Sequence, residues 1–117
     1  MRDVVKAMKA LSDETRLRTL NVLLERECCV CEVMQALDIS QTRASRNLGI
    51  LHDAGFLTMR KEGLWRVYSV DQDIVKEYYA LLVEAVRKSL EDDEMAASDR
   101  RRLKTAERVG CVKTCAP

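Results

Sequence analysis

The sequence has few residues that interrupt helices and no long apolar run. Its 117 residues include four glycines and one proline, and that proline is the last residue. Long stretches of the chain are therefore free to be helical. No run of about 18 apolar residues is present. Nor does the N-terminus show the apolar segment of a signal peptide, so we expect neither a membrane protein nor a secreted one.

What the sequence does contain is typical of one solvated globular domain. Hydrophobic residues make up 47% of the chain and charged residues 33%, a balance that excludes a disordered protein. At 117 residues the chain is too short for two ordinary hydrophobic cores. It carries five cysteines, and we expect it in the reducing cytoplasm, where clustered thiols indicate a metal site or redox chemistry before structural disulfides.

The net charge is only +1, but the charged residues are unevenly distributed. Between Ser40 and Tyr68 five basic residues stand against two acidic ones, whereas residues 91–99 hold five acidic residues and no Lys or Arg. A local positive surface on a nearly neutral protein is typical of a molecule that contacts phosphate at one face. The three arginines at residues 100–102 fit a solvated face.

Hydrophobic periodicity predicts four helices in the first half of the chain, at residues 3–11, 13–25, 30–37 and 41–53. Ser12 is the expected cap of the second helix and Ser40 that of the fourth, because both can accept a hydrogen bond from the first turn. Residues 38–40 break the third helix, with Ile39 filling the gap. Ala54-Gly55 ends the fourth helix.

The pattern then changes to that of strands. Residues 56–60 and 65–70 are rich in β-forming residues and flank residues 61–64, whose glycine predicts a hairpin turn. Beyond Asp71 a long helix extends to Leu90, and its wide apolar stripe favours packing on its own domain and on a partner. Two short helices joined by three residues and followed by a hairpin predict an α+β, mainly α fold, a helix-turn-helix with a two-stranded wing.

The fourth predicted helix has an outer face that suits the major groove of DNA. Its inner side carries Ala44, Leu48 and Leu51, whereas the opposite side carries hydroxyls, a guanidinium and a position without a side chain. Arginine can bind guanine with two hydrogen bonds, and glycine permits close approach. The predicted DNA-binding residues are Gln41, Thr42, Arg43, Ser45, Arg46 and Gly49, with Lys61 and Arg66 on the hairpin. The alternative is a winged module of the same fold that binds protein.

Three cysteines within four residues form the most informative stretch. Cys28, Cys29 and Cys31 can surround one soft ion, because thiolate sulfur selects such ions. In a regular helix Cys29 and Cys31 would point about 200° apart, at about 100° per residue. To bind one ion together, this turn must unwind on binding or be irregular from the start. Because the DNA-reading helix packs on this helix, we expect ion binding to disturb the DNA-reading face. Apolar packing and thiol redox sensing are the alternatives.

Three segments resemble the ArsR/SmtB family of metal-responsive bacterial repressors: residues 11–18, residues 40–48, and the hairpin from Gly55 to Tyr68. The resemblance covers about residues 3–90 and implies a homodimer that binds a palindromic operator in double-stranded DNA and leaves it when metal binds. We expect residues 1–97 to form the DNA-binding and dimerisation domain and residues 98–117 a C-terminal helix or tail with Cys111 and Cys115.

The segment Cys29-Val30-Cys31 resembles the Cys-Val-Cys motif of the arsenite-responsive branch of that family. The resemblance implies that trivalent arsenic or antimony is held by three thiolates and acts as the inducer. A further ligand in that branch can lie three residues past the second cysteine, where this chain has Met34 instead. Cys28 is the expected third ligand because it is adjacent, and Cys111 and Cys115 are its competitors.

Other functions are disfavoured by the residues present. Cadmium and lead sensors of the family recruit extra cysteines from the N-terminal arm, and none precedes Cys28 here. Zinc sensors use histidine and carboxylates on the last long helix, but the single histidine is His52, and Asp71 and Asp73 alone make a poor zinc site. The alternative functions are a thiol-redox-sensing repressor and a cadmium- or lead-sensing repressor of the same fold. No glycine-rich phosphate loop follows any cysteine, so we expect neither an enzyme nor an organic cofactor.

Overall fold

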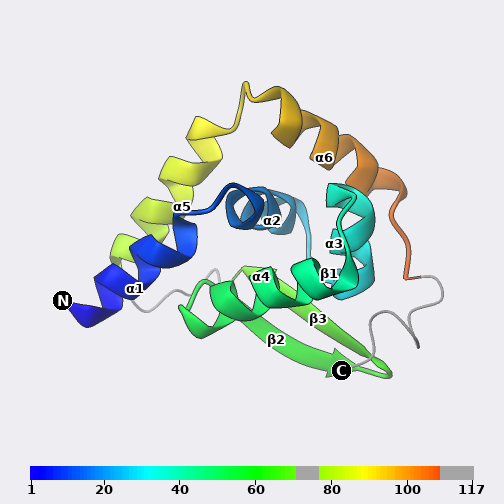
Figure 1. Ribbon diagram of the computed structural model, residues 1–117, viewed down its shortest axis with the longest axis horizontal. Coiled ribbons are helices and arrows are strands. Elements are labelled where there is room, and N and C mark those ends of the chain that lie inside the picture. Colours follow the sequence, from blue (N-terminus) through cyan, green and yellow to red (C-terminus); the bar gives the residue numbers. More distant parts are fainter. Residues whose placement is uncertain (71–76, 109–117) are drawn as a thin grey trace.

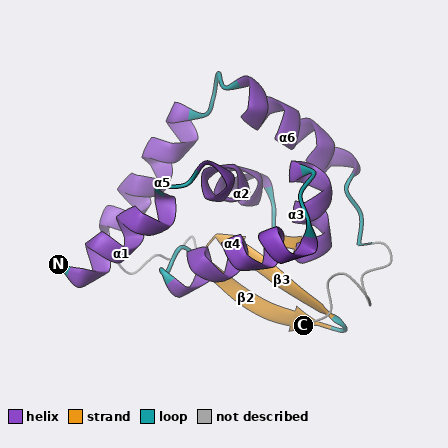
Figure 2. Ribbon diagram, viewed as in Figure 1, coloured by secondary structure: helices purple, strands orange, loops and turns teal. Residues whose placement is uncertain are grey.

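Six helices and three short strands make up residues 1–70 and 77–108, the part of the chain that the computed structural model describes (Figure 1; Figure 2). In chain order they are α1 (Arg2–Leu11), α2 (Glu14–Glu25), β1 (Cys28–Cys29), α3 (Val30–Leu37), α4 (Gln41–Asp53), β2 (Leu57–Glu62), β3 (Trp65–Val70), α5 (Glu77–Ser89) and α6 (Glu94–Thr105). Helices α3 and α4 form the predicted helix-turn-helix, and β2 and β3 form the wing.

The second helix begins at Glu14, one residue later than predicted. The Asp13 carboxylate accepts a hydrogen bond from the Arg16 N–H at 3.0 Å and so caps α2. The prediction that Ser12 is this cap is wrong. Its hydroxyl donates instead to the Met8 carbonyl oxygen at 2.8 Å, so Ser12 ends α1 rather than starting α2.

The turn between α3 and α4 agrees with the sequence prediction. Asp38 ends α3 in the left-handed region at a φ of 55°, and Ile39 packs against the hydrophobic core. The Ser40 hydroxyl then accepts a hydrogen bond from the Arg43 N–H at 3.2 Å and caps α4. The three-residue connection therefore fixes how the two helices of the motif meet.

The wing is longer than predicted because its turn is shorter. Gly63 lies at a φ of 62°, which glycine adopts readily. Lys61 and Glu62 were expected in the turn, but they belong to β2, where they pair with Arg66 and Trp65 of β3. The turn is therefore confined to residues 63 and 64.

A third strand, which the sequence did not predict, joins the wing to the helices. β1 pairs antiparallel with β3, with Cys28 opposite Tyr68 and Cys29 opposite Val67, which gives the sheet order β1-β3-β2. A two-residue strand is too short to show any periodicity. Its consequence is that the cysteine segment is hydrogen-bonded to the wing.

The core lies where α2, α3 and α4 pack on one another and on the sheet. Its largest fully buried side chains are those of Leu20, Leu37, Leu48, Leu51 and Phe56. Tyr79 of α5 closes one side, since its hydroxyl donates to the Ala54 carbonyl oxygen at 2.6 Å and its ring lies 4.8 Å from that of Phe56. None of the helices in the described ranges combines the length and apolar character needed to cross a membrane.

Helix α6 packs against α2 and α3, and with α5 it forms an arch over α2 (Figure 1). The expected division between residues 97 and 98 lies inside this helix. The fully buried Asp99 pairs with Arg18 of α2 at 2.8 Å and with Arg102 at 2.7 Å. Arg102 also donates to the Ala36 carbonyl oxygen at 2.8 Å, and Arg100 binds the Asn21 side chain at 3.1 Å. Two of the three arginines expected on a solvated face therefore bind within the protein.

Candidate nucleic-acid interface and thiol site

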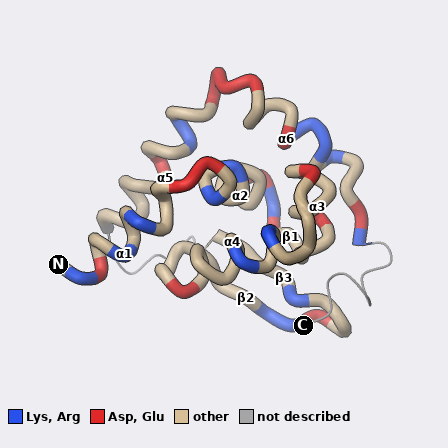
Figure 3. The backbone as a smooth tube through the Cα atoms, viewed as in Figure 1, with Lys and Arg blue, Asp and Glu red and all other residues tan. Residues whose placement is uncertain are grey.

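Helix α4 has one buried face and one outward face, as its periodicity predicts. The three apolar residues expected inside, Ala44, Leu48 and Leu51, are completely buried. Four of the residues of α4 that were predicted to read DNA are exposed to solvent: Thr42, Arg43, Ser45 and Arg46. Lys and Arg positions mark both α4 and the wing in Figure 3. The structure therefore leaves a polar, basic surface on the second helix of the helix-turn-helix.

Arg43 makes a contact within the protein, whereas Gly49 is not required by packing within the chain. One nitrogen of the Arg43 guanidinium donates to the Thr15 hydroxyl at 3.0 Å, so this side chain bridges α4 to α2. An added Cβ at Gly49 would meet no atom within 4 Å, so packing within the chain does not require glycine there. A position without a side chain on an outward helix face leaves room for a partner to approach closely. Gln41 is half-buried at the start of the same helix.

On the wing, Lys61 and Arg66 stand directly opposite each other in β2 and β3. Like charges in such a cross-strand pair are destabilising unless an anion lies between them. Lys61 is exposed, and the Arg66 Nε is buried with no hydrogen-bond partner among the described residues. The neighbouring Arg60 is different, because its guanidinium pairs with Glu27 and with Glu62. Within the described residues, Lys61 and Arg66 are therefore the two wing cations without an ion-pair partner.

The thiol segment is irregular from the start, which is one of the two alternatives left by helix geometry. Cys28 and Cys29 belong to β1, and α3 begins only at Val30, so Cys29 is an extended N-cap residue with φ −87° and ψ 172°. The expected separation of about 200° in direction does not apply, since it assumes two helical residues. The Sγ atoms of Cys29 and Cys31 lie 2.7 Å apart, and both residues are buried. No unwinding is needed to bring these two sulfurs together.

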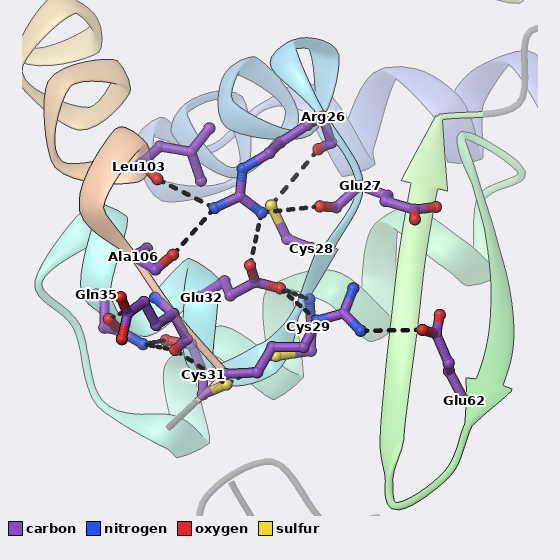
Figure 4. A network of polar contacts seen from close by, with 12 residues as sticks. Arg26, Glu27, Cys28, Cys29, Cys31, Glu32, Gln35, Glu62, Leu103 and Ala106 are labelled. Carbon is purple, nitrogen blue, oxygen red and sulfur yellow. Dashed lines mark hydrogen bonds and ion pairs between the residues drawn. The ribbon is translucent and has the colours of Figure 1, made fainter. Parts of the chain in front are cut away.

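Cys28 lies apart from this pair. Adjacent residues of a strand point to opposite faces, and Figure 4 shows the Cys28 sulfur turned toward Arg26, away from the sulfurs of Cys29 and Cys31. Its Sγ donates to the Arg26 carbonyl oxygen at 3.5 Å. Burial raises the pKa of the Cys28 thiol to about 12, so it stays protonated near neutral pH. The structure does not bring together the three adjacent cysteines that the sequence prefers as one site.

The end of α6 reaches the thiol pair. The Cys31 Sγ lies 3.9 Å from the Glu107 carbonyl oxygen. Gln35 donates to the same oxygen at 2.6 Å and accepts from the Glu107 N–H at 3.1 Å. Cys111 and Cys115 lie outside the described residues. Over residues 1–70 and 77–108, no group of three or more His, Cys, Asp or Glu side chains is arranged to hold a metal ion.

Glu32 organises this turn, and the sequence analysis did not single it out. Its Oε1 accepts from the Cys29 N–H at 2.9 Å, and its Oε2 accepts from Arg26 at 2.6 Å. Burial on its own would raise the pKa of Glu32, but hydrogen bonds from Cys29, Arg26 and Arg108 outweigh it and hold the pKa below 4.5. The signal that could have found Glu32 is its place three residues after the N-cap, where a carboxylate commonly returns to the cap N–H.

Two further residues behave as their sequence context suggests. His52 is exposed at the end of α4, 3.7 Å from the Asp53 carboxylate and edge-on to the ring of Tyr68. Met34, which stands where the arsenite branch can have a ligand, packs against the core. Asp71 and Asp73, considered for zinc, lie outside the described residues.

Residues 13–58, from the N-cap of α2 into β2, match the family described as bacterial regulatory protein, arsR family. A cadmium resistance transcriptional regulatory protein CadC homolog from Staphylococcus aureus is 45% identical over 76 residues, which cover 64% of this chain and 63% of the relative. The arsenic resistance transcriptional regulator ArsR1 from Pseudomonas putida is 41% identical over 75 residues, which cover 63% of this chain and 59% of the relative. The chain thus spans about three fifths of the length of these relatives.

The fold gives the same result as the sequence matches. The homodimeric winged helix-turn-helix DNA-binding domain of Mb0332 from Mycobacterium bovis has a TM-score of 0.64 to this structure at 28% identity, covering 80% of this chain and 82% of that one. The matched proteins are DNA-binding regulators rather than enzymes. The winged fold, the outward face of α4 and the sequence matches agree that this chain belongs to the ArsR family of bacterial regulatory proteins.

Proposed function

We propose that this chain is a homodimeric repressor that binds operator DNA through α4 and the wing and leaves it when trivalent arsenic or antimony binds. As a regulator of DNA it would act in the cytoplasm. The observation that supports a soft ion as the inducer is the 2.7 Å separation of the Cys29 and Cys31 Sγ atoms at the N-cap of α3. Helix α3 packs directly on α4, so a single helix connects the two sulfurs to the surface that would bind DNA.

The sulfur pair fits a soft ion with little rearrangement. Two sulfurs bound to one ion through bonds of about 2.3 Å lie about 3.5 Å apart, so the pair needs to open by less than about 1 Å. Thiolate ligands select soft ions over hard ones. The names of the relatives point in the same direction, since they include an arsenic regulator and a cadmium regulator. Three-sulfur coordination favours trivalent arsenic or antimony as the inducer of this chain.

For the third sulfur, the geometry favours the tail over Cys28. Cys28 points away from the pair, and its thiol is held protonated by burial. Arg108 is fixed beside the pair by Glu32, and Cys111 follows three residues later along the chain. Three residues of extended chain reach about 10 Å, which is enough to place a Cys111 thiolate beside Cys29 and Cys31. Cys115 is the second choice because four more residues must then be ordered.

Release from DNA follows from the place of the pair in the fold. An ion bound by both sulfurs changes their separation, and Cys29 is the N-cap on which the first turn of α3 is built. Since α3 packs on α4, a shift of that turn changes how α4 is presented to the major groove. Such couplings are typically worth about 1–3 kcal/mol, or about 5- to 150-fold in DNA affinity. By reciprocity, DNA weakens the ion's binding by the same factor.

The test is operator release by arsenite in cysteine variants. Reduced protein is titrated onto a DNA duplex selected by this protein from a random pool, at fixed salt, with and without arsenite. We expect Cys29→Ser and Cys31→Ser to bind DNA normally and to lose release. Cys28→Ser is the matched control and keeps release if the tail supplies the third sulfur. Release that persists in both Cys29→Ser and Cys31→Ser contradicts the site.

The number of sulfurs on the ion is measured separately. X-ray absorption of the arsenite complex is expected to show three sulfur neighbours in the wild type and two in Cys111→Ser. If Cys28→Ser, rather than a tail variant, loses one sulfur, the adjacent cysteine is the third ligand. Cadmium titrations in parallel distinguish the two metal classes, because a cadmium sensor would be released by cadmium at lower concentration than by arsenite.

A second candidate function is thiol-redox sensing, and the same sulfur separation favours it. In the reduced protein, hydrogen peroxide can join two sulfurs this close: it takes two electrons and the two thiol protons, a disulfide forms, and two water molecules leave. The discriminating measurement is release of the reduced, metal-free protein by peroxide alone. Release by arsenite without release by peroxide favours the metal sensor, and the converse favours the redox sensor.

A further inference from the structure

Beyond the contact of α3 with α4, a second physical connection leads from the thiol segment to the wing. Arg108, the last described residue, binds Glu32 of α3 at 3.2 Å through its Nε and Glu62 of β2 at 3.4 Å through a terminal nitrogen. Figure 4 shows Glu32 beside the cysteines and Glu62 on the wing. One guanidinium therefore spans two elements that are 30 residues apart in the chain.

At the sensor end, one oxygen atom belongs to both the thiol turn and the bridge. The Glu32 Oε1 accepts from the Cys29 N–H at 2.9 Å and from Arg108 at 3.2 Å. The other oxygen is held by Arg26, which also donates to the carbonyl oxygens of Leu103 and Ala106 at the end of α6. A carboxylate fixed from both sides cannot follow a displaced Cys29 N–H without changing its contact with Arg108.

At the wing end, Arg108 contacts both members of one cross-strand pair. Arg108 forms an ion pair with Glu62. The Arg108 guanidinium carbon lies 5.9 Å from the ring centre of Trp65, the residue opposite Glu62. Glu62 also binds Arg60 at 2.8 Å, and Arg60 pairs with Glu27 at the entry to β1. The next pair along the hairpin is Lys61 with Arg66, the two wing cations left for phosphate. The bridge therefore holds the wing immediately beside its candidate DNA contacts.

We propose that Arg108 is a positioning residue that transmits occupancy of the thiol site to the wing. The proposal rests on the proposed function, since it assigns a second route by which an ion at Cys29 and Cys31 lowers DNA affinity. When the ion displaces Cys29, Glu32 shifts, the Glu32–Arg108–Glu62 bridge loosens, and the wing no longer holds Lys61 and Arg66 where a phosphate needs them. Arg108, which follows α6, thereby takes part in transmitting ion binding to the wing, in addition to the role proposed for Cys111 as a ligand.

The experiment compares Arg108→Gln with Arg101→Gln. Both remove one positive charge from the same end of the molecule, but Arg101 lies exposed on α6 and has no part in the bridge. The quantity measured is the ratio of the DNA dissociation constants with and without saturating arsenite. We expect Arg108→Gln to lower this ratio about 2- to 30-fold, the usual range for substitutions along a coupling route. Arg101→Gln is expected to keep the wild-type ratio, and arsenite stoichiometry stays unchanged in both.

Glu62→Gln and the double variant test whether the bridge itself is responsible. If the signal passes through the Arg108–Glu62 contact, the double variant is no worse than the more affected single variant. The fluorescence of Trp65, the only tryptophan, gives a readout without DNA. We expect arsenite to change its emission in the wild type and in Arg101→Gln, but not in Arg108→Gln.

The outcomes separate the two proposals. An unchanged release ratio in Arg108→Gln, or purely additive effects of Arg108→Gln and Glu62→Gln, overturns the wing route while arsenite sensing stands. Failure of arsenite to release the wild-type protein overturns the proposed function, and the wing route falls with it. Equal thermal denaturation midpoints of the wild type and the four variants show that the comparison concerns coupling and not folding.

Discussion

The DNA-facing helix and the thiol segment both begin at a helix N-cap, but their surroundings are opposite. At α4 the Ser40 hydroxyl makes the cap, and the outward side chains of the following turns are exposed to solvent. At α3 the cap is the fully buried Cys29, whose N–H is bound by Glu32. Glu32 in turn binds arginines from the end of α2 and from the segment after α6.

This difference separates the proposed DNA-binding surface of α4, called the reading surface below, from the proposed thiol site, called the sensing site. A reading surface is made by leaving one face of an amphipathic helix outside the core, which requires only local periodicity. A sensing site must change its neighbours when occupied, so it needs contacts to distant parts of the chain. The thiol pair has such contacts on every side, to β3, to Glu32 and to Glu107. The four predictions below test this division, from the largest expected effect to the smallest.

The largest effect is expected at Asp99, which fixes α6 to the sensing side. Asp99→Ala leaves the Arg18 guanidinium, only 15% exposed, without its carboxylate partner. Breaking a buried ion pair in this way costs about 3–5 kcal/mol in the free energy of unfolding. The measurement is the urea denaturation midpoint.

The control for Asp99 is Asp92→Ala, at an exposed position just before α6, which is expected to change stability by less than about 0.5 kcal/mol. Equal midpoints for the two variants would mean that α6 contributes little to the fold. In that case α6 would not be what positions Glu107 and Arg108 beside the thiol segment, and the contrast between the two regions would weaken.

The second effect is expected at Glu32, with a defined pH dependence. Glu32→Gln loses charged hydrogen bonds to Arg26 and Arg108, worth about 1.5–3 kcal/mol in total at neutral pH. The pKa of Glu32 in the folded protein is lower than the 4.5 of the free side chain. Its carboxylate therefore stabilises the fold fully above pH 4.5, and this contribution is lost as the pH falls through the folded pKa.

The stability difference between wild type and Glu32→Gln is therefore expected to be constant above pH 4.5 and to shrink below it. Denaturation curves at a series of pH values measure it. The matched control is Glu107→Gln, whose backbone rather than side chain contacts the thiol segment. A difference that grows on acidification would mean that burial, and not the arginines, dominates at Glu32.

The residues of the reading surface could be predicted from the sequence, and those of the sensing site only in part. Ala44, Leu48 and Leu51 repeat at helical spacing, so the sequence identifies the opposite face as exposed. The bounds of α3 and the cap at Ser40 follow from equally local rules. Cys29 and Cys31 could be selected because thiols within three residues are chemically conspicuous.

The missing parts of the sensing site are long-range. Arg108 meets Glu32 across 76 residues, and Arg26 meets the Leu103 carbonyl oxygen across 77, so no periodicity or spacing signals either contact. β1 is too short to have a pattern, yet it makes Cys29 extended, which is the irregular start that the sequence left as one of two alternatives. Adjacency in the sequence likewise does not predict the direction of the Cys28 sulfur, because strand geometry alternates side chains.

The third effect is expected at Arg46, on the reading surface. Arg46→Ala removes an exposed guanidinium from the outward face of α4 and is expected to weaken DNA binding by about 1–3 kcal/mol, or about 5- to 150-fold. Arg43→Ala is expected to cost less, because the Arg43 guanidinium already binds Thr15. Fluorescence anisotropy at fixed salt measures both. A larger loss in Arg43→Ala would mean that Arg43 leaves Thr15 when DNA binds.

The smallest effect is expected at Gly49, where stability and DNA affinity are expected to change in opposite directions. A Cβ at this position meets no atom of the chain within 4 Å, so Gly49→Ala is expected to stabilise the protein by about 0.5–1 kcal/mol, since glycine costs that much inside a helix. The same methyl group is expected to weaken DNA binding, because it fills the space through which the helix approaches a base edge. Gly63→Ala is the contrasting control: at a φ of 62° an alanine is strained, so this variant loses stability. If Gly49→Ala gains both stability and DNA affinity, then α4 does not approach DNA through this face, and the reading surface must be sought on its flank.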